Sequence, residues 1–146
     1  MAKTSISVQL EIYGDSFDLQ SISTRLNITP TKQWKKGDCV ETSIVENEYI
    51  AVDHSVTLTR KATVWRLETG HEESYKISTQ ARKLLDIVAE KTDELCRIQT
   101  EESVEIRISF VIYVYDNITP ALIIDKELVA FAHAINAHID IDQYFY

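Results

Sequence analysis

Hydrophobic and polar residues alternate in three segments of the chain, which predicts three β-strands. These segments are residues 6–12, residues 104–115 and residues 138–142. In the first and the last, one face of the strand is hydrophobic and the other polar, as is typical of a sheet with one buried face. The middle strand is polar on that second face only at its start and becomes hydrophobic there from Val111 onward. We therefore expect its far end to be covered on both sides.

A second period, close to 3.6 residues, indicates three helices. The longest covers residues 77–98, roughly six turns, and two shorter ones cover residues 19–26 and 128–135. Asp18 and Asp125 stand just before the short helices. At such an N-cap position a carboxylate can accept hydrogen bonds from the first backbone N–H groups, so we expect both residues to cap their helices.

The remaining segments add short strands. Residues 39–68 are rich in Val, Ile, Thr and Tyr and predict two or three strands that end in TVWRLET, and residues 121–125 predict one more. The order of these elements predicts an α+β fold: a two-layer α/β sandwich with a largely antiparallel or mixed sheet and helices mainly on one face. We expect a ferredoxin-like core with an inserted hairpin, in a single globular domain over residues 1–146.

The composition excludes several classes of site. The 146 residues are 45% hydrophobic, so we expect a core that is stable without a disulfide or a structural metal ion. The three glycines are isolated, so we expect no glycine-rich phosphate loop. Cys39 and Cys96 do not form a CxxC pair, which excludes a disulfide framework and a four-thiolate zinc site. No run approaches the roughly 18 apolar residues of a membrane span. We expect a cytoplasmic protein without a cofactor and without a catalytic constellation.

Charge is distributed unevenly along the chain. Its formal net charge is −8, yet residues 1–66 hold eight basic and eight acidic side chains while residues 67–146 hold seven and fifteen. A negative field repels nucleic acid and anionic lipid over about 8 Å at physiological salt, so we expect neither as a partner.

Asp86, Glu90 and Glu94, together with Asp93, share the outer side of the predicted long helix. Like charges four residues apart destabilise an isolated helix by a few tenths of a kcal/mol. One interpretation is that this face attracts a basic protein partner. The alternative is a face that only keeps the protein soluble.

A second candidate surface surrounds Trp34, which lies in the polar segment PTKQWKKGD with Lys35, Lys36 and Asp38. A ring flanked by cations can stack on an aromatic ligand or on a partner side chain. Trp65 also has basic neighbours and would fall beside this loop if the strands bring them together. The alternative is that both rings close the core while the basic side chains reach solvent. We expect Trp34 to be partly exposed and Trp65 to be mainly buried.

The last strand carries the pattern that most resembles a metal site. His138, Asp140 and Asp142 alternate onto one face, with His133 on the helix before them. A histidine and two carboxylates can hold a divalent ion, but alternating polar residues are also what a solvated strand face shows. We expect no functional metal here.

Three segments together resemble a known family: IYGDSFDLQSISTRLNITPTKQWKKGD, VWRLETG and TPALIIDKELVAFAHAINAHIDIDQYFY. Over nearly the whole chain they are similar to the bacterial uncharacterised family called domain of unknown function four-two-seven-nine. The shared marks are Gly14 and Phe17, Pro30-Thr31, Trp34, Gly37-Asp38, the Trp65 to Gly70 segment, Pro120, Asp125 and the closing Ile-Asp-Ile-Asp. The resemblance implies a bacterial cytosolic α+β protein and transfers no activity, catalytic residue or cofactor.

Two functions from different classes fit these observations. The first is a non-catalytic protein-binding module whose partner would be basic, immunity-like or antitoxin-like by analogy of class and size; a homodimer is also compatible with the sequence. The second is a small-molecule-binding domain or weak enzyme. Its site would lie between Trp34, Asp38, Trp65 and the carboxylates of the last strand.

Overall fold

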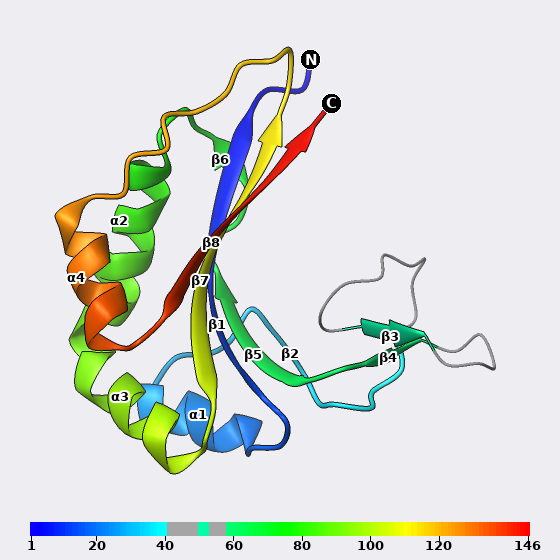
Figure 1. Ribbon diagram of the computed structural model, residues 1–146, viewed down its shortest axis with the longest axis vertical. Coiled ribbons are helices and arrows are strands. Elements are labelled where there is room, and N and C mark those ends of the chain that lie inside the picture. The colour runs from blue at the N-terminus through cyan, green and yellow to red at the C-terminus, as the bar shows by residue number, and fades with distance from the viewer. Residues whose placement is uncertain (41–49, 53–57) are drawn as a thin grey trace.

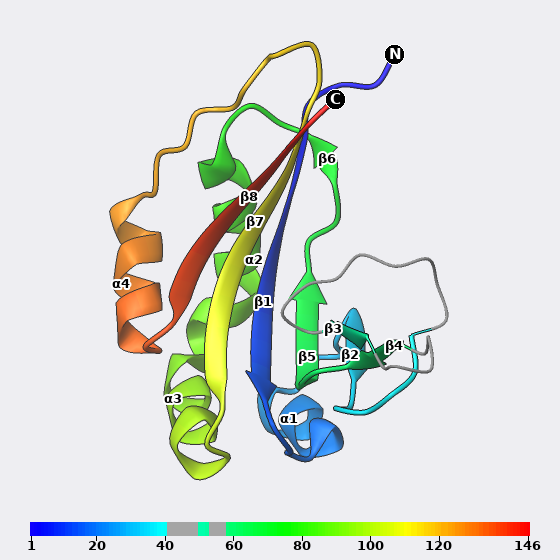
Figure 2. The same cartoon turned by 45° about the vertical axis from the view of Figure 1, so that its right-hand side comes forward.

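A mixed β-sheet crosses the molecule, and the helices cover only one of its two faces (Figures 1 and 2). The structure, a computed structural model, describes residues 1–40, 50–52 and 58–146. The strand order is β2 (Lys32–Trp34), β5 (Thr63–Glu68), β1 (Ser5–Gly14), β7 (Glu105–Val114) and β8 (His138–Phe145), and the short β6 (Glu72–Glu73) also pairs with β1. The predicted α+β fold class is confirmed. We call the face of the sheet away from the helices the open face.

Strand directions depart in one place from the predicted ferredoxin-like core. β1 is antiparallel to both β5 and β7, so β5 and β7 run parallel to each other with β1 between them. This is the split βαβ arrangement of a ferredoxin-like core. β8, however, lies parallel beside β7, which makes an ordinary βαβ unit because a helix joins two adjacent strands.

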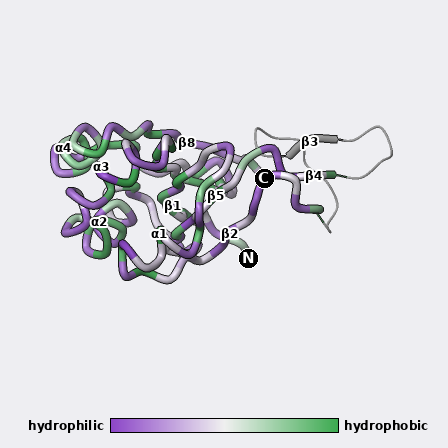
Figure 3. Tube along the Cα trace, turned by 90° about the horizontal axis from the view of Figure 1, so that it is seen from below, coloured by the Kyte–Doolittle hydropathy of each residue, from purple (hydrophilic) through white to green (hydrophobic). Residues whose placement is uncertain are grey.

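The hairpin inserted in this core is a separate two-stranded antiparallel sheet. It pairs β3 (Ile50–Val52) with β4 (Leu58–Arg60). Figure 3 shows it on the side of the sheet opposite the helices. The rest of the predicted strand segment, residues 41–49 and 53–57, lies outside the described residues.

The predicted long helix is divided. α2 (Ile77–Val88) ends in a short 3-10 turn, η1 (Ala89–Lys91), and α3 (Thr92–Glu101) follows. α2 packs on β1, whereas α3 contacts α1 (Leu19–Leu26) and α4 (Lys126–Ala134). The two helices thus pack against different elements. The break between them lets both bury their apolar face, and the hydrophobic period does not reveal it.

The two predicted caps behave differently. Asp18 accepts hydrogen bonds from the backbone N–H groups of Gln20 and Ser21 at 3.0 and 3.3 Å, as the sequence predicts. Asp125 occupies the N-cap position of α4, but its side chain makes no capping hydrogen bond. The strand predicted over residues 121–125 is wrong: only Ala121 forms an isolated bridge, with Lys76. The edge of β7 is occupied by β8, and residues 121–125 lead into α4 instead of pairing there.

The core lies between the sheet and the helices. Its largest fully buried side chains come from every layer, among them Trp65, Phe110, Leu10, Ile22 and Leu84. None of the helices in the described residues is long and apolar enough to cross a membrane.

Candidate functional site

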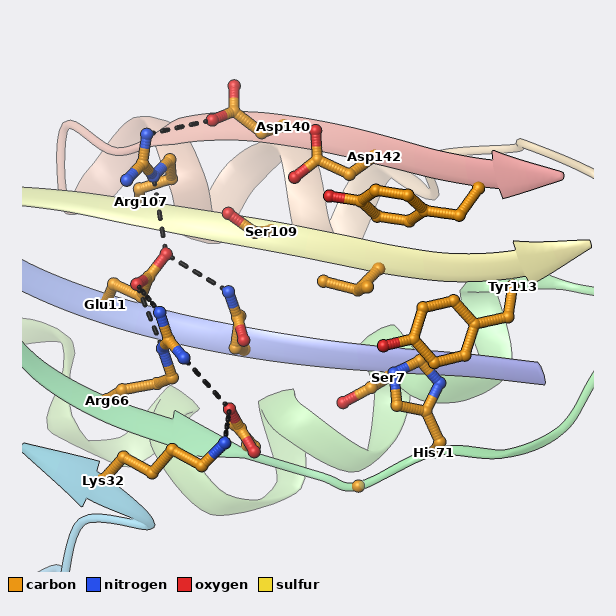
Figure 4. A pocket seen from close by; sticks show the side chains of 15 residues that line it. Ser7, Glu11, Lys32, Arg66, His71, Arg107, Ser109, Tyr113, Asp140 and Asp142 are labelled. Atoms are coloured by element: carbon orange, nitrogen blue, oxygen red, sulfur yellow. Dashed lines mark hydrogen bonds and ion pairs between the residues drawn. The ribbon is translucent and has the colours of Figure 1, made fainter. Parts of the chain in front are cut away.

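The open face holds a polar hollow of about 390 Å³ (Figure 4), which we call the sheet hollow. Its walls and floor come from neighbouring strands, since residues paired across two strands point to the same face. It is lined by Ser7, Gln9 and Glu11 of β1, Arg107, Ser109, Val111 and Tyr113 of β7, and Asp140, Asp142 and Tyr144 of β8. On the side away from β8 it is lined by Lys32 of β2, Arg66 and Glu68 of β5, and Gly70 and His71, which follow β5.

A buried carboxylate joins the three central strands. Glu11 of β1 pairs in register with Arg66 of β5 on one side and with Arg107 of β7 on the other. Arg66 donates to Glu11 Oε2 from Nε at 3.1 Å and from Nη2 at 2.9 Å. The Nε atom of Arg107 lies 3.5 Å from Glu11 Oε1, and the Glu11 side chain is only 2% exposed. Two guanidinium groups thus neutralise one buried carboxylate.

This cluster continues to both edges of the sheet. Arg66 Nη1 lies 3.4 Å from Glu68 Oε1, which lies 3.7 Å from Lys32 Nζ on β2. In the other direction Arg107 Nη1 donates to Asp140 Oδ2 on β8 at 3.3 Å. Charges of alternating sign therefore cross all five strands of the main path. Such a network holds the strands in one register, since a slip of any one strand by one residue would move its charged side chains to the helix-covered face.

Small polar side chains make the floor of the sheet hollow. Ser7 and Ser109 are nearly fully buried, and Gln9 lies opposite Ser109 in the pairing of β1 with β7. Gln9 donates from Nε2 to Glu11 Oε1 at 3.3 Å. A serine here leaves space that a larger residue would fill. The short side chains of Ser7 and Ser109 are the reason that a cavity exists on an otherwise ordinary sheet face.

Aromatic side chains close the far end. The ring of His71 stacks on Tyr113, with centroids 4.1 Å apart and planes within 7°, and Tyr144 meets Tyr113 edge-on at 5.9 Å. His71 Nδ1 lies 3.3 Å from the Oγ atom of Ser5. Although much of His71 is exposed, burial of its stacked face lowers the pKa of the imidazole, against a smaller opposing effect of Glu68. Burial likewise raises the pKa of Tyr113. Both rings are uncharged at neutral pH.

The charge of the sheet hollow is slightly negative. Three basic and four acidic side chains line it. The exposed carboxylate of Asp142 has no ion-pair partner among the described residues, and it lies on β8 two residues before Tyr144. A free carboxylate close to aromatic rings is a suitable environment for a cationic group, which is attracted both to the charge and to the ring faces.

The structure separates the two tryptophans. Trp34 pairs with Val64, and Trp65 is the next residue of β5, so the two rings lie on opposite faces of the sheet. Trp65 is fully buried and donates from Nε1 to Ser23 Oγ at 3.0 Å. The expectation that Trp34 is partly exposed is wrong: the residue is buried, with 9% of its surface exposed, and the Arg60 guanidinium lies 4.0 Å from the ring centre.

The other residues of this predicted surface form a turn outside the sheet hollow. Asp38 Oδ2 accepts a hydrogen bond from the backbone N–H of Lys35 at 2.8 Å, and Lys36 Nζ binds Asp15 at 2.5 Å. Gly37 between them has φ +92°, a conformation that favours glycine. The structure therefore does not bring Trp34, Asp38 and Trp65 together into one site.

The predicted acidic helix face is also divided. Asp86 lies on α2, Glu90 on η1 and Glu94 on α3. Glu94 accepts hydrogen bonds from Arg25 of α1 at 2.6 Å and from Arg97 at 2.7 Å, and the Arg25 bond lowers the pKa of this carboxyl. Glu94 thus links two helices, while Asp86 and Glu90 are exposed.

The three candidate metal ligands His138, Asp140 and Asp142 lie on one face of β8, but they do not converge on one point. Asp140 and Asp142 line the sheet hollow, whereas His138 borders a second hollow of about 210 Å³ with Gln99 and Glu105. Within the described ranges, no group of three or more His, Cys, Asp or Glu side chains is placed to hold a metal ion.

Sequence reasoning missed most of the sheet hollow. Its buried charges left little signal, because Glu11 and Arg107 stand on the polar face of alternating strands, where the pattern predicts contact with solvent. A charged residue inside a strand of a covered sheet needs a partner. The sequence does not show which residue that partner is.

A family model described as Domain of unknown function (DUF4279) matches residues 3–146. The match spans essentially the whole chain, and the resemblance drawn from the sequence is confirmed. No curated protein and no solved structure matches the chain.

Proposed function

We propose that this chain, which belongs to the family of the domain of unknown function (DUF4279), is a non-catalytic binding module that holds another protein at the open face of its sheet. The observation that carries the proposal is the sheet hollow, a polar cavity in the one sheet face that the helices leave uncovered. The partner presents a basic side chain to it. Asp142 supplies the carboxylate and Tyr144 an exposed ring beside it.

The rigidity of the surrounding sheet favours such a role. The ion pairs that run from Lys32 through Glu11 to Asp140 fix five strands in one register, so the walls of the sheet hollow are formed before a partner arrives. A preformed site loses less conformational freedom on binding than a flexible one. We place the protein in the bacterial cytoplasm, where Cys39 and Cys96, both free thiols, stay reduced. An immunity-like or antitoxin-like role is the form of stoichiometric binding that this size and charge favour.

Affinity purification of the tagged protein from its native cell, with quantitative mass spectrometry, tests the proposal. We expect the wild-type protein and the control Glu90→Gln to enrich the same basic partner, because Glu90 is exposed on η1, between two helices that cover the other face of the sheet. Asp142→Lys, which reverses an exposed charge at the sheet hollow, should lose that partner. Either an acidic partner or equal capture by Asp142→Lys would contradict the proposal.

The volume of the sheet hollow supports a second candidate function. At about 390 Å³ it falls in the range of roughly 300–1,000 Å³ that is typical of small-molecule pockets. The ligand would be a small amine or another donor-rich molecule. A thermal-shift series with alkylamines distinguishes the two functions: a rise in Tm that Asp142→Lys abolishes, together with no captured protein, favours the small molecule.

A further inference from the structure

The outer edge of β8 is an uncovered strand edge. β8 is the last strand of the sheet, and no described residue pairs with its outer side. In Figure 1 it runs along the near side of the molecule with no element in front of it. The edge at the other end of the sheet, β2, is only three residues long, whereas β8 has eight. Unpaired backbone groups of this kind readily accept another strand.

The hydrogen bonds of β8 show which of its backbone groups are available. The N–H of Tyr146 donates to the carbonyl of Val114 on β7 at 2.9 Å. Successive residues of a strand direct their backbone groups to opposite sides in the plane of the sheet. Even-numbered residues of β8 therefore bind β7. The backbone N–H and C=O groups of Ile139, Ile141, Gln143 and Phe145 point outward.

We infer that this edge binds an extended segment of the partner as an added strand, and that the segment alternates basic and hydrophobic residues. The inference rests on the proposed function and specifies how the partner docks. An added strand lies about 4.8 Å from β8. Every second side chain of the added strand would then stand on the open face, next to Asp140 and Asp142. The carboxylates of these two residues complement a basic side chain. The intervening side chains would lie on the opposite face, next to the half-buried Ile139 and Ile141 and the exposed Phe145.

Charge argues against a second copy of the chain at the same edge. If two copies of β8 paired antiparallel around Asp140, Ile141 or Asp142, an aspartate would stand opposite an aspartate. Like charges directly opposite each other destabilise a strand pair. The same two carboxylates thus discourage self-association and select a basic segment.

An NMR titration with a defined peptide tests the inference. The probe is an eight-residue peptide, capped at both ends, in which Lys and Val alternate. A control peptide has the same composition with the four Lys residues grouped before the four Val residues, and a second control replaces Lys by Glu. We expect the alternating peptide to protect the amides of Ile139, Ile141, Gln143 and Phe145 from hydrogen exchange, and the controls to leave them unprotected. Lack of protection at these amides, or equal protection by the grouped peptide, overturns the inference.

Gln143 provides a matched pair of variants. Gln143→Pro removes one outward N–H without removing a bond to β7, as proline allows on an edge strand. Gln143→Thr keeps that N–H. We expect Gln143→Pro to weaken peptide binding about five- to tenfold, the effect of losing one hydrogen bond, and Gln143→Thr to bind like the wild type. If Gln143→Pro does not fold, the protection measurement on the wild type decides alone.

The two proposals fail in different ways. If Asp142→Lys loses the native partner while Gln143→Pro keeps it, the open face is the binding surface and the added strand is wrong. If neither variant changes capture, both proposals are overturned.

Discussion

Arg66 holds the carboxylate of Glu11 by two hydrogen bonds in the middle of the sheet, from Nε and Nη2 to the same oxygen. Removing one member of a buried ion pair leaves the other charge without compensation, which destabilises a protein by about 3–5 kcal/mol. We expect Glu11→Gln to lower the free energy of unfolding by about 3 kcal/mol, measured by urea denaturation.

Asp142→Asn is the matched control for that experiment. It changes an exposed carboxylate on the same face of the sheet. Exposed substitutions usually alter stability by less than about 0.5 kcal/mol. A loss of similar size in both variants would show that the Glu11 cluster is not a buried network.

The two N-cap aspartates give a second comparison. Asp18 accepts two backbone hydrogen bonds at the start of α1, whereas the side chain of Asp125 accepts none at the start of α4. Replacing a hydrogen-bonded N-cap by alanine destabilises a protein by about 1 kcal/mol. We therefore expect Asp18→Ala to lower the Tm clearly more than Asp125→Ala in calorimetry. The reverse order would contradict the capping geometry.

His71 should make stability depend on pH. Its pKa is lowered in the folded protein, so below the unfolded-state value of about 6.5 the unfolded chain takes up a proton that the folded protein does not. This contribution is fully present above that pH and is lost as the pH falls toward the folded pKa. We expect the urea midpoint of the wild type to fall more between pH 7.5 and 5.5 than that of His71→Phe, which keeps an aromatic ring beside Tyr113. Equal falls would show that His71 is not responsible.

Both tryptophans should be shielded from a charged quencher. Trp34 is 9% exposed and Trp65 is fully buried. Iodide quenching of the single-tryptophan variants Trp34→Phe and Trp65→Phe should give low constants for both, compared with N-acetyltryptophanamide. Strong quenching of the ring left in Trp65→Phe would indicate that Trp34 is accessible, as the sequence alone suggested.

Folding should require neither metal nor disulfide. In a chain of 146 residues, the core between the sheet and the helices is large enough to stabilise the fold without a metal ion or a disulfide. Thermal melts with and without chelator, and with and without reductant, should coincide. A fall of more than a few degrees with chelator would restore His138, Asp140 and Asp142 as candidate metal ligands.

Local periodicity was sufficient to predict most of the secondary structure. Alternation marked β1 and β7, and a polar N-cap followed by a helical period marked α1 and α4. These features depend on residues a few positions apart, so the chain itself carries them. The α+β class followed from their order.

Register and strand order lay beyond that reasoning. Nothing local says that Glu11 stands between Arg66 and Arg107, or that Trp34 and Trp65 face opposite sides, because each pairing joins residues far apart in the chain. The break between α2 and α3 was hidden for a similar reason, since the hydrophobic period continues across it.

The sequence by itself thus determined the elements, the acidic balance and the family resemblance. Only the tertiary structure decided where the site lies. A side chain's face is set by local alternation, but its neighbours on that face are set by how strands are paired, and pairing is a property of the whole sheet. The short side chains of Ser7 and Ser109 become a cavity only when β1 and β7 lie side by side.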